Sequence, residues 1–268
     1  MLSKPYVSYV SQNLRFFAPM SFYKQTVIGI VCICLVYGSF ARQQFSGWVS
    51  VYNFFRFSKS FSIECDATLH STDKWLHTQS NQEWIGLLYH FNEHWNIGLG
   101  YSFFDSRESI DDNTGYAIEH QGWEQLLVSY PLQTGKGIRG RRGTLLQRVR
   151  LENRFIPQVF LAGNSIKSDG TLFANRFRYL VRNQMPLLPT NNFTRGPYIA
   201  VHDEVYLNIS GRAKRNVKWL DQNRSYIGTG YRFHKKLDVE LGYLLQYSET
   251  TNSDTRNNII QLSGFMHL

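Results

Sequence analysis

The chain has 268 residues, 43% hydrophobic and 18% charged, which is enough for one large domain or two small ones. Aromatic residues make up 15% of it, as in soluble all-β domains and in the interfacial girdles of membrane barrels. The net charge of +9 suits anionic lipid headgroups or nucleic acid, but no zinc-finger, helix-turn-helix or RNA-binding signature accompanies it, so we expect no nucleic-acid partner.

The first element in chain order is the only long apolar run, at 26–40. Its length of about 15 residues is short for a membrane-spanning helix, which needs roughly 20. Lys24 precedes the run and a small-x-small sequence ending at Ala41 follows it, as in a signal peptide and its cleavage site. We therefore predict a signal peptide over 1–41, with Met20 as an alternative start of translation. An uncleaved membrane anchor is the other interpretation.

Residues 42–268 read almost entirely as strands and turns. Runs of about ten residues alternate in polarity and are separated by turn residues, and no stretch shows a sustained helical period. In 95–104, 199–209 and 237–247, one face is apolar and aromatic while the other carries polar residues, charges and glycines. The expected strands are 47–57, 61–70, 82–91, 95–105, 122–132, 144–155, 174–185, 198–209, 223–233, 237–248 and 258–268.

The lengths of the strands and of their connections indicate a membrane barrel. Strands of ten or more residues exceed the five or six of soluble sheets and match the 9–11 that cross a bilayer. Very short connections at 58–60, 92–94 and 234–236 alternate with long ones, as in transmembrane barrels. Bacterial barrels of one chain normally have an even strand number, so we expect an antiparallel up-and-down transmembrane barrel of about 10–12 strands, with ten or twelve favoured over eleven. The long connections are expected at 70–81, 106–120, 156–173, 210–222 and 249–257.

The polarity of the two faces sets the orientation of the wall. With the apolar face toward lipid, Ile227 and Leu241 point outward, while Gly228 and Gly242 point inward. A soluble lipid-binding barrel, which is one alternative, would have its apolar face inward instead.

This orientation also directs a band of Arg and Glu into the barrel. Buried charges persist when they are paired, and the planar fork of arginine grips carboxylates in bidentate fashion. We predict an ion-pair network in which Glu204 pairs with one or more of Arg154, Arg178 and Arg224, and in which arginine outnumbers acid. A pore lining or an anion site is the alternative reading of the same band. The predicted network comprises Arg148, Arg150, Glu152, Arg154, Arg176, Arg178, Glu204, Arg224 and Glu240, with Arg182, Tyr206 and Tyr226 on the same face.

A basic turn follows the fifth expected strand. Its glycines at 135–140 match G-x-G-x-x-G, but the dinucleotide fingerprint requires a helix next, and a strand at 144–155 is expected instead. The positive charges suggest contact with lipid phosphate, with an ordinary solvated turn as the alternative. The basic residues are Lys136, Arg139, Arg141 and Arg142.

We expect neither a metal nor a cofactor. His90 and His94 match H-x-x-E-H, but that chemistry needs one helical face, and here the segment is a strand end and a turn. Only Cys65 would remain after signal removal, which leaves no internal disulfide and no cysteine metal site. His202 and Asp203 are neighbours in a strand, so their side chains point to opposite faces and cannot form a catalytic triad by themselves.

Several short polar motifs occur in a fixed order over 148–246. They are Glu152-Asn153-Arg154-Phe155, Arg176 with Arg178, Asp203-Glu204-Val205-Tyr206-Leu207-Asn208, Asp221-Gln222-Asn223-Arg224, Tyr226-Ile227-Gly228, and Glu240-Leu241-Gly242-Tyr243 with Gln246. Their order and spacing, together with Trp48, resemble a family of uncharacterised secreted proteins, mainly of Bacteroidota, known as domain of unknown function 2490. The resemblance covers most of 45–268 and implies an outer-membrane-type barrel with no assigned activity. The insertion at 156–173 departs from the family pattern.

These patterns lead to one functional expectation. We expect a non-enzymatic barrel in the outer membrane of a Gram-negative bacterium, either structural or a narrow solute channel, with small or absent conductance that favours anions. The expected partners are membrane lipids or lipopolysaccharide and the barrel-insertion machinery. A lipid-modifying hydrolase at the rim is the enzymatic alternative.

Overall fold

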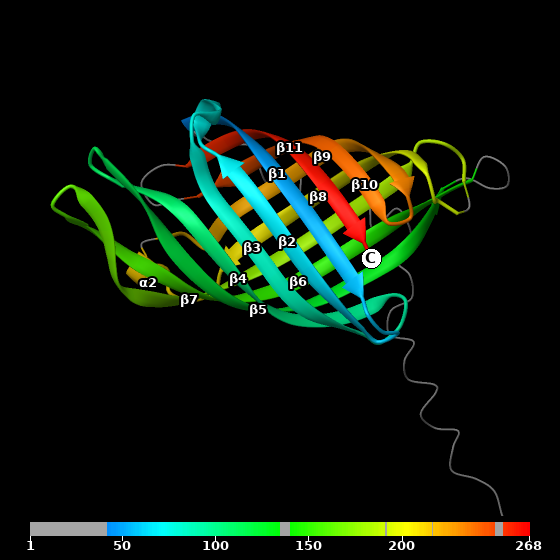
Figure 1. Ribbon diagram of the computed structural model, residues 1–268, viewed down its shortest axis with the longest axis horizontal. Helices are drawn as coiled ribbons and strands as arrows, with labels where there is room; N and C mark the ends of the chain where they lie inside the picture. Colours follow the sequence, from blue (N-terminus) through cyan, green and yellow to red (C-terminus); the bar gives the residue numbers. More distant parts are fainter. Residues whose placement is uncertain (1–41, 135–139, 191, 216, 250–253) are drawn as a thin grey trace, which may run out of the picture. The chain divides into compact units, whose positions relative to one another are not determined.

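Eleven β-strands form a closed barrel in the computed structural model of the protein (Figure 1). The structure describes residues 42–134, 140–190, 192–215, 217–249 and 254–268, so the predicted signal peptide lies outside the described residues. The strands are β1 (Arg42–Arg56), β2 (Phe61–Ser71), β3 (Thr78–His90), β4 (Trp95–Ile110), β5 (Asn113–Thr134), β6 (Arg141–Ala162), β7 (Ser165–Pro186), β8 (Gly196–Asn208), β9 (Leu220–His234), β10 (Leu237–Ser248) and β11 (Thr255–His267).

A parallel pair of strands closes the barrel. Consecutive strands are all antiparallel, whereas β1 pairs in parallel with β11, from Arg42 opposite Thr255 to Phe54 opposite His267. With an odd number of alternating strands, the first and the last run in the same direction, so their pairing must be parallel. Eleven strands fall within the predicted 10–12, but the preference for an even number and for antiparallel pairing throughout is wrong. Each expected strand has a counterpart in the barrel, although β5, β6 and β7 are longer than expected.

The two ends of the barrel differ in their connections. Three short connections, 57–60, 91–94 and 235–236, lie at one end, here called the short-turn end, which also carries the longer connection 187–195. The opposite, long-loop end carries the connections that contain the 3-10 helix η1 (Asp73–Trp75) and the helix α2 (Arg212–Arg215). No helix among the described residues is long and apolar enough to cross a membrane. Lys218 and Asp254 join two loops of the long-loop end by an ion pair of 3.0 Å, and this hydrogen bond raises the pKa of Lys218.

Two of the predicted long loops are strands instead. The segments expected as loops at 106–120 and 156–173 continue β4 into β5 and β6 into β7, and both hairpins project beyond the neighbouring strands (Figure 1). Their turns are tight, since Asp111 and Gly163 adopt φ values of 52° and 63°, as short hairpin turns require. Polar residues near these turns obscure the strand pattern, because a hairpin that extends beyond the barrel wall has no strand on either side to pack its apolar face.

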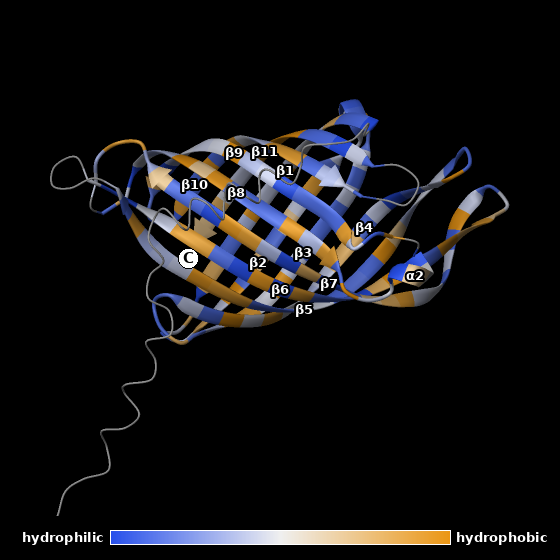
Figure 2. Ribbon diagram, turned by 180° about the vertical axis from the view of Figure 1, so that it is seen from behind, coloured by the Kyte–Doolittle hydropathy of each residue, from blue (hydrophilic) through white to orange (hydrophobic). Residues whose placement is uncertain are grey.

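Hydrophilic and hydrophobic residues alternate along the strands (Figure 2), and successive side chains of a strand point to opposite faces of the wall. Each of the eleven strands exposes at least one large apolar side chain, and Ile227 and Leu241 are 52% and 53% exposed. A Cβ atom added at Gly228 or Gly242 would meet the hydroxyl of the inward-facing Tyr226 at 2.2 or 2.3 Å. These two glycines therefore face inward as predicted and leave the space that the tyrosine ring occupies.

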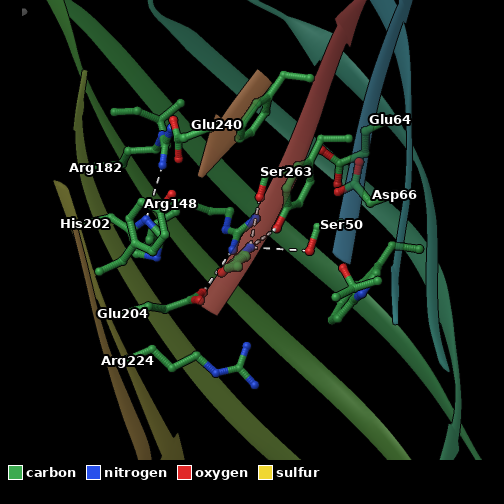
Figure 3. A pocket seen from close by; sticks show the side chains of 18 of the residues that line it. Ser50, Glu64, Asp66, Arg148, Arg182, His202, Glu204, Arg224, Glu240 and Ser263 are labelled. Carbon is green, nitrogen blue, oxygen red and sulfur yellow. Dashed lines mark hydrogen bonds and ion pairs between the residues drawn. The ribbon is translucent and has the colours of Figure 1, made fainter. Parts of the chain in front are cut away.

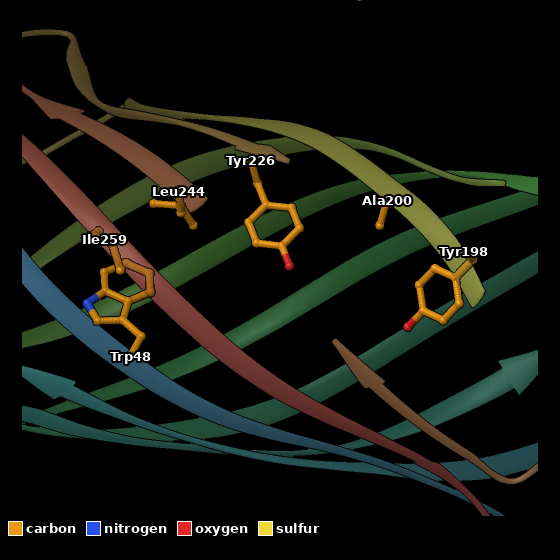
Figure 4. Packing of buried hydrophobic residues seen from close by; sticks show 6 residues of the cluster. All are labelled: Trp48, Tyr198, Ala200, Tyr226, Leu244 and Ile259. Carbon is orange, nitrogen blue, oxygen red and sulfur yellow. The ribbon is translucent and has the colours of Figure 1, made fainter. Parts of the chain in front are cut away.

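A small apolar cluster packs inside the barrel (Figure 4). Trp48 of β1 belongs to it and stacks on His70 of β2, with ring centroids 3.8 Å apart. This cluster covers only part of the inner wall, so polar and charged side chains fill the rest. Its members are Trp48, Tyr198, Ala200, Tyr226, Leu244 and Ile259.

Candidate functional site

The candidate site is the lumen, where arginines and carboxylates form a network of ion pairs. Glu152 has no solvent exposure and accepts hydrogen bonds from Arg176 Nε and Arg178 Nη1, both at 2.6 Å. Arg178 also donates to Glu204 at 2.9 Å, and Glu204 accepts from Arg148 Nη2 at the same distance. The pairs form one chain through Glu119, Arg154, Asp221, Arg176, Glu152, Arg178, Glu204 and Arg148.

The register of β6 and β7 produces this arrangement. Charged residues occupy every second position from Arg148 to Arg154 on β6, so all of them point to the same side of the strand. The pairing of β6 with β7 places Glu152 opposite Arg176 and so brings acidic and basic side chains next to one another. The chemistry of the lumen therefore follows from a period of two residues combined with one strand register.

A second group surrounds Arg150. Its guanidinium lies between two tryptophan rings, 4.7 Å from the centroid of Trp84 and 4.3 Å from that of Trp123. It also donates to Glu64 at 3.0 Å and to Gln125 at 2.6 Å. Cation–π contacts and a charged hydrogen bond together compensate for the loss of water around a fully buried cation.

Of the three partners predicted for Glu204, only Arg178 pairs with it, which is enough to confirm the prediction of one or more. The expected contact with Arg178 is present, but Arg154 pairs with Glu119 at 2.5 Å, and Arg224 has no carboxylate within 4.0 Å among the described residues. The partner that was missed is Arg148. Side chains on non-consecutive strands meet according to the tilt and stagger of the barrel, which strand spacing in the sequence does not give.

The predicted excess of arginine in the lumen is wrong. Five acids were missed: the polar faces of β2 and β5 were left out of the band, and Asp221 and Asp238 were not included from β9 and β10. The sequence over 61–70 does indicate two of these acids. There the polarity alternation places Glu64 and Asp66 on the face opposite Ile63 and Leu69. The barrel wall directs inward eight arginines, Arg148, Arg150, Arg154, Arg176, Arg178, Arg182, Arg224 and Arg232, and eight acids, Glu64, Asp66, Glu119, Glu152, Glu204, Asp221, Asp238 and Glu240.

Two further ion pairs lie in the part of the lumen nearer the short-turn end. Arg182 Nη2 binds Glu240 at 2.6 Å, and Arg232 Nη2 binds Asp238 at 2.7 Å. Charged pairs are thus present along the length of the lumen, from Asp221 near the long-loop end to Asp238 near the opposite end.

A cavity of about 280 Å³ remains beside these pairs (Figure 3). The side chains of Leu127, Leu146 and Leu180 form an apolar part of its wall. Charged residues line the remainder, among them Arg224 of β9 and Asp66 of β2. The cavity can therefore offer both polar and apolar contacts to a small molecule.

His202 and Asp203 lie on opposite faces of β8, as the alternation predicts. The ring of His202 stacks on Tyr226 at 4.5 Å inside the barrel, and its Nδ1 atom lies 3.2 Å from Arg182 Nη1. The carboxylate of Asp203 accepts hydrogen bonds from its neighbours on β9, including one of 2.7 Å from Ser225. Within the described residues, no group of three or more His, Cys, Asp or Glu side chains is arranged to hold a metal ion.

One cluster of possible catalytic type was missed by the sequence analysis. Ser62 Oγ lies 2.8 Å from His90 Nε2, and His90 Nδ1 contacts Asn96 Oδ1. This is the order of nucleophile, base and orienting group that acyl transfer uses. However, Ser62 is only 3% exposed and does not line the lumen cavity, so its hydroxyl has no substrate space in front of it. The second histidine of the H-x-x-E-H match, His94, instead lies 2.8 Å from the carbonyl oxygen of Ser129.

The predicted basic turn is described only in part. Lys136 and Arg139 lie outside the described residues, whereas Arg141 and Arg142 begin β6 and are exposed at the short-turn end. Other exposed basic residues of that end are Arg56, Lys59, Lys235 and Lys236.

The fold and its charged interior define the class as a closed β-barrel with an ion-paired lumen. Residues 45–257 match the model of a family described as protein of unknown function (DUF2490), and the chain belongs to this family. The match begins in β1 and ends in β11, so it includes strands from the whole barrel wall. A comparison with curated proteins finds no match.

Proposed function

We propose that this protein is a non-enzymatic barrel of a Gram-negative outer membrane, with a lumen closed by ion pairs. The inverted polarity of the wall carries the proposal: large apolar side chains are exposed on all eleven strands, while the sixteen charges of the network lie inside. A water-soluble protein rarely exposes a continuous apolar surface of this extent. A lipid bilayer would cover that surface and remove it from water.

Aromatic residues at the short-turn end support the same proposal. Phe57, Phe61, Tyr89 and Phe91 contact one another in series, with centroid distances of 6.3, 5.2 and 5.1 Å. Such girdles are typical of the boundary between the hydrocarbon and the headgroups. The exposed basic residues of the same end, including Arg142, would then meet lipid phosphates or lipopolysaccharide.

The interior favours a structural barrel or a very narrow channel over an open pore. Long guanidinium and carboxylate side chains extend into the lumen, and the cavity beside their ion pairs measures about 280 Å³. The two alternatives fit less well. A soluble lipid-binding barrel requires an apolar inner wall, and a hydrolase requires a nucleophile that its substrate can reach, which the buried Ser62 does not provide.

The proposal is tested by placing a charge on the outer face. Leu241→Arg should lower the free energy of folding into phospholipid vesicles by about 2–4 kcal/mol, because a cation at mid-membrane depth loses its hydration. Heat-modifiable electrophoretic migration and urea titration measure this effect. Ser109→Arg, at an exposed position on the projecting β4–β5 hairpin, is the matched control and should fold normally. Equal folding of both variants, with purification in the absence of detergent, would contradict a membrane location.

A further inference from the structure

We propose that the lumen cavity is a binding site for a small zwitterion, with Arg224 holding its anionic group and Asp66 its cationic group. The two residues lie on opposite sides of the pocket (Figure 3). The strands β1, β11 and β10 separate β2 from β9 in the barrel wall. This inference goes beyond the membrane proposal and does not depend on it, because it concerns the folded barrel alone.

The pattern of ion pairs selects these two residues. Of the sixteen inward charges named above, fourteen have an opposite charge within 4.0 Å, and only Arg224 and Asp66 do not. An uncompensated charge in a protein interior is costly, and a charged ligand relieves that cost. Because the two unpaired groups have opposite signs and share one cavity, a single ligand with both charges compensates them together.

Arg224 is held in position to receive an anion. Its guanidinium lies 4.7 Å from the ring centroid of Trp48 and 4.8 Å from that of Tyr206, and its Nε donates to Gln222 at 3.2 Å. The two terminal amino groups make no hydrogen bond to any described residue, and they form the fork that binds a carboxylate in bidentate fashion. The Nε atom of Arg148, on the wall of the same cavity, is also buried without a partner.

Asp66 provides the opposite pole. Its Oδ1 atom is buried without a hydrogen-bond partner among the described residues. The neighbouring acid on the same wall, Glu64, is already engaged by Arg150 at 3.0 Å, so Asp66 is the carboxylate left for a cation. A primary ammonium group is compact and has three donors, which suits a site of this kind.

The rest of the wall determines the shape of the ligand. The volume of about 280 Å³ lies near the lower end of the usual range of roughly 300–1,000 Å³, so the ligand is small. Leu127, Leu146 and Leu180 provide apolar surface for a short hydrocarbon linker. Because the two charged groups are on opposite walls, we infer a ligand with separated charges, such as an ω-amino acid or a dipeptide.

The test uses ω-amino acids of increasing length, namely glycine, 4-aminobutyrate and 6-aminohexanoate, on the folded, detergent-solubilised protein. Binding is measured by isothermal titration calorimetry and by the shift in unfolding midpoint. Hexanoate and hexylamine, which each lack one of the two charges, serve as matched probes. We expect at least one ω-amino acid to bind about tenfold or more tightly than either single-charge analogue. If no zwitterion binds, or if the analogues bind equally well, the proposal is overturned.

Two variants separate the poles. Arg224→Gln should remove the contribution of the carboxylate, so that hexylamine binds as well as 6-aminohexanoate, and Asp66→Asn should do the same for hexanoate. A merely structural role of either residue would weaken all probes alike and would contradict the assignment. Arg107→Gln and Asp112→Asn, on the projecting β4–β5 hairpin, are controls that should leave binding unchanged. The wild-type comparison of the probes decides the question even if a cavity variant fails to fold.

Discussion

Among single residues, Glu152 shows most clearly what holds the lumen together. It has no solvent exposure, and two guanidinium groups bind its two oxygens from one neighbouring strand. Arg176 and Arg178 are themselves buried, so neither can replace the carboxylate with water. The stability of the barrel therefore depends on the pairing and not on the mere presence of these charges.

Removing the charge of Glu152 tests this dependence. Glu152→Gln keeps the size of the side chain but removes the carboxylate that Arg176 and Arg178 share, so that two buried cations lose a common counter-charge. We expect the free energy of unfolding to fall by about 3–5 kcal/mol, measured by urea titration of tryptophan fluorescence in vesicles. Asp112→Asn, which neutralises an exposed acid on the projecting β4–β5 hairpin, should leave the midpoint nearly unchanged. Equal midpoints for the two variants would mean that the network adds little to stability.

Alternation in the sequence predicts which residues enter the lumen, but not which of them meet. All nine predicted network residues lie on the inner wall, because a period of two residues fixes the face of a strand. The partner of Glu204 was predicted only in part, since contacts such as that with Arg148 of β6 cross over an intervening strand. Tilt and stagger decide such contacts, and they are properties of the closed barrel.

At the level of elements, the two projecting hairpins have a different role from the barrel wall. Beyond the pair of Ile156 and Leu172, β6 and β7 form strand hydrogen bonds only with each other, and no third strand pairs with either of them. A Cβ atom added at Gly115 of the β4–β5 hairpin would meet Ile166 at 2.9 Å, so the hairpins also contact one another. The sequence predicted loops here because the polarity alternation that marks a wall strand is absent.

Shortening the β6–β7 hairpin tests its independence from the wall. Replacing residues 157–171 by Asn-Gly closes the hairpin with a favourable two-residue turn. We expect the shortened protein to keep its unfolding midpoint and heat-modifiable migration, since no inward residue of the network is removed. Val181→Pro, which breaks hydrogen bonding of β7 inside the wall, should prevent folding. Loss of folding in the shortened variant would show that the hairpin is part of the barrel's folding unit.

For the whole molecule, the balance of inward charge bears on transport. Eight arginines face eight acids among the inward charges named above, so these sixteen charges leave no excess of either sign. The anion preference expected from the sequence therefore has no basis in the wall as a whole. The overall barrel and its polarity were predictable, because both follow from strand length and alternation. The parallel closure was not predicted, because the count of eleven strands was set aside in favour of the even number that is the rule.

Conductance measurements in planar bilayers test the closed lumen. We expect small or absent current steps, without a marked preference for anions or cations, because paired side chains occupy the space through which ions would pass. An open porin measured in the same membranes provides the scale. Large, long-lived steps would contradict the closed lumen. Strong anion selectivity would show that some of the inward-facing carboxyl groups are protonated and carry no charge.

The parallel seam also has a consequence for how the protein folds. Ser46 and Asn257 form a hydrogen bond across it although 211 residues separate them in the chain, whereas every other strand pair joins neighbours in the sequence. Contacts of such high sequence separation form slowly, so we expect the seam to close last. Until then β1 and β11 are two free edges of an open sheet, which invite pairing with other chains. A cellular insertion factor that pairs with one edge until the other arrives would protect this protein at its rate-limiting step.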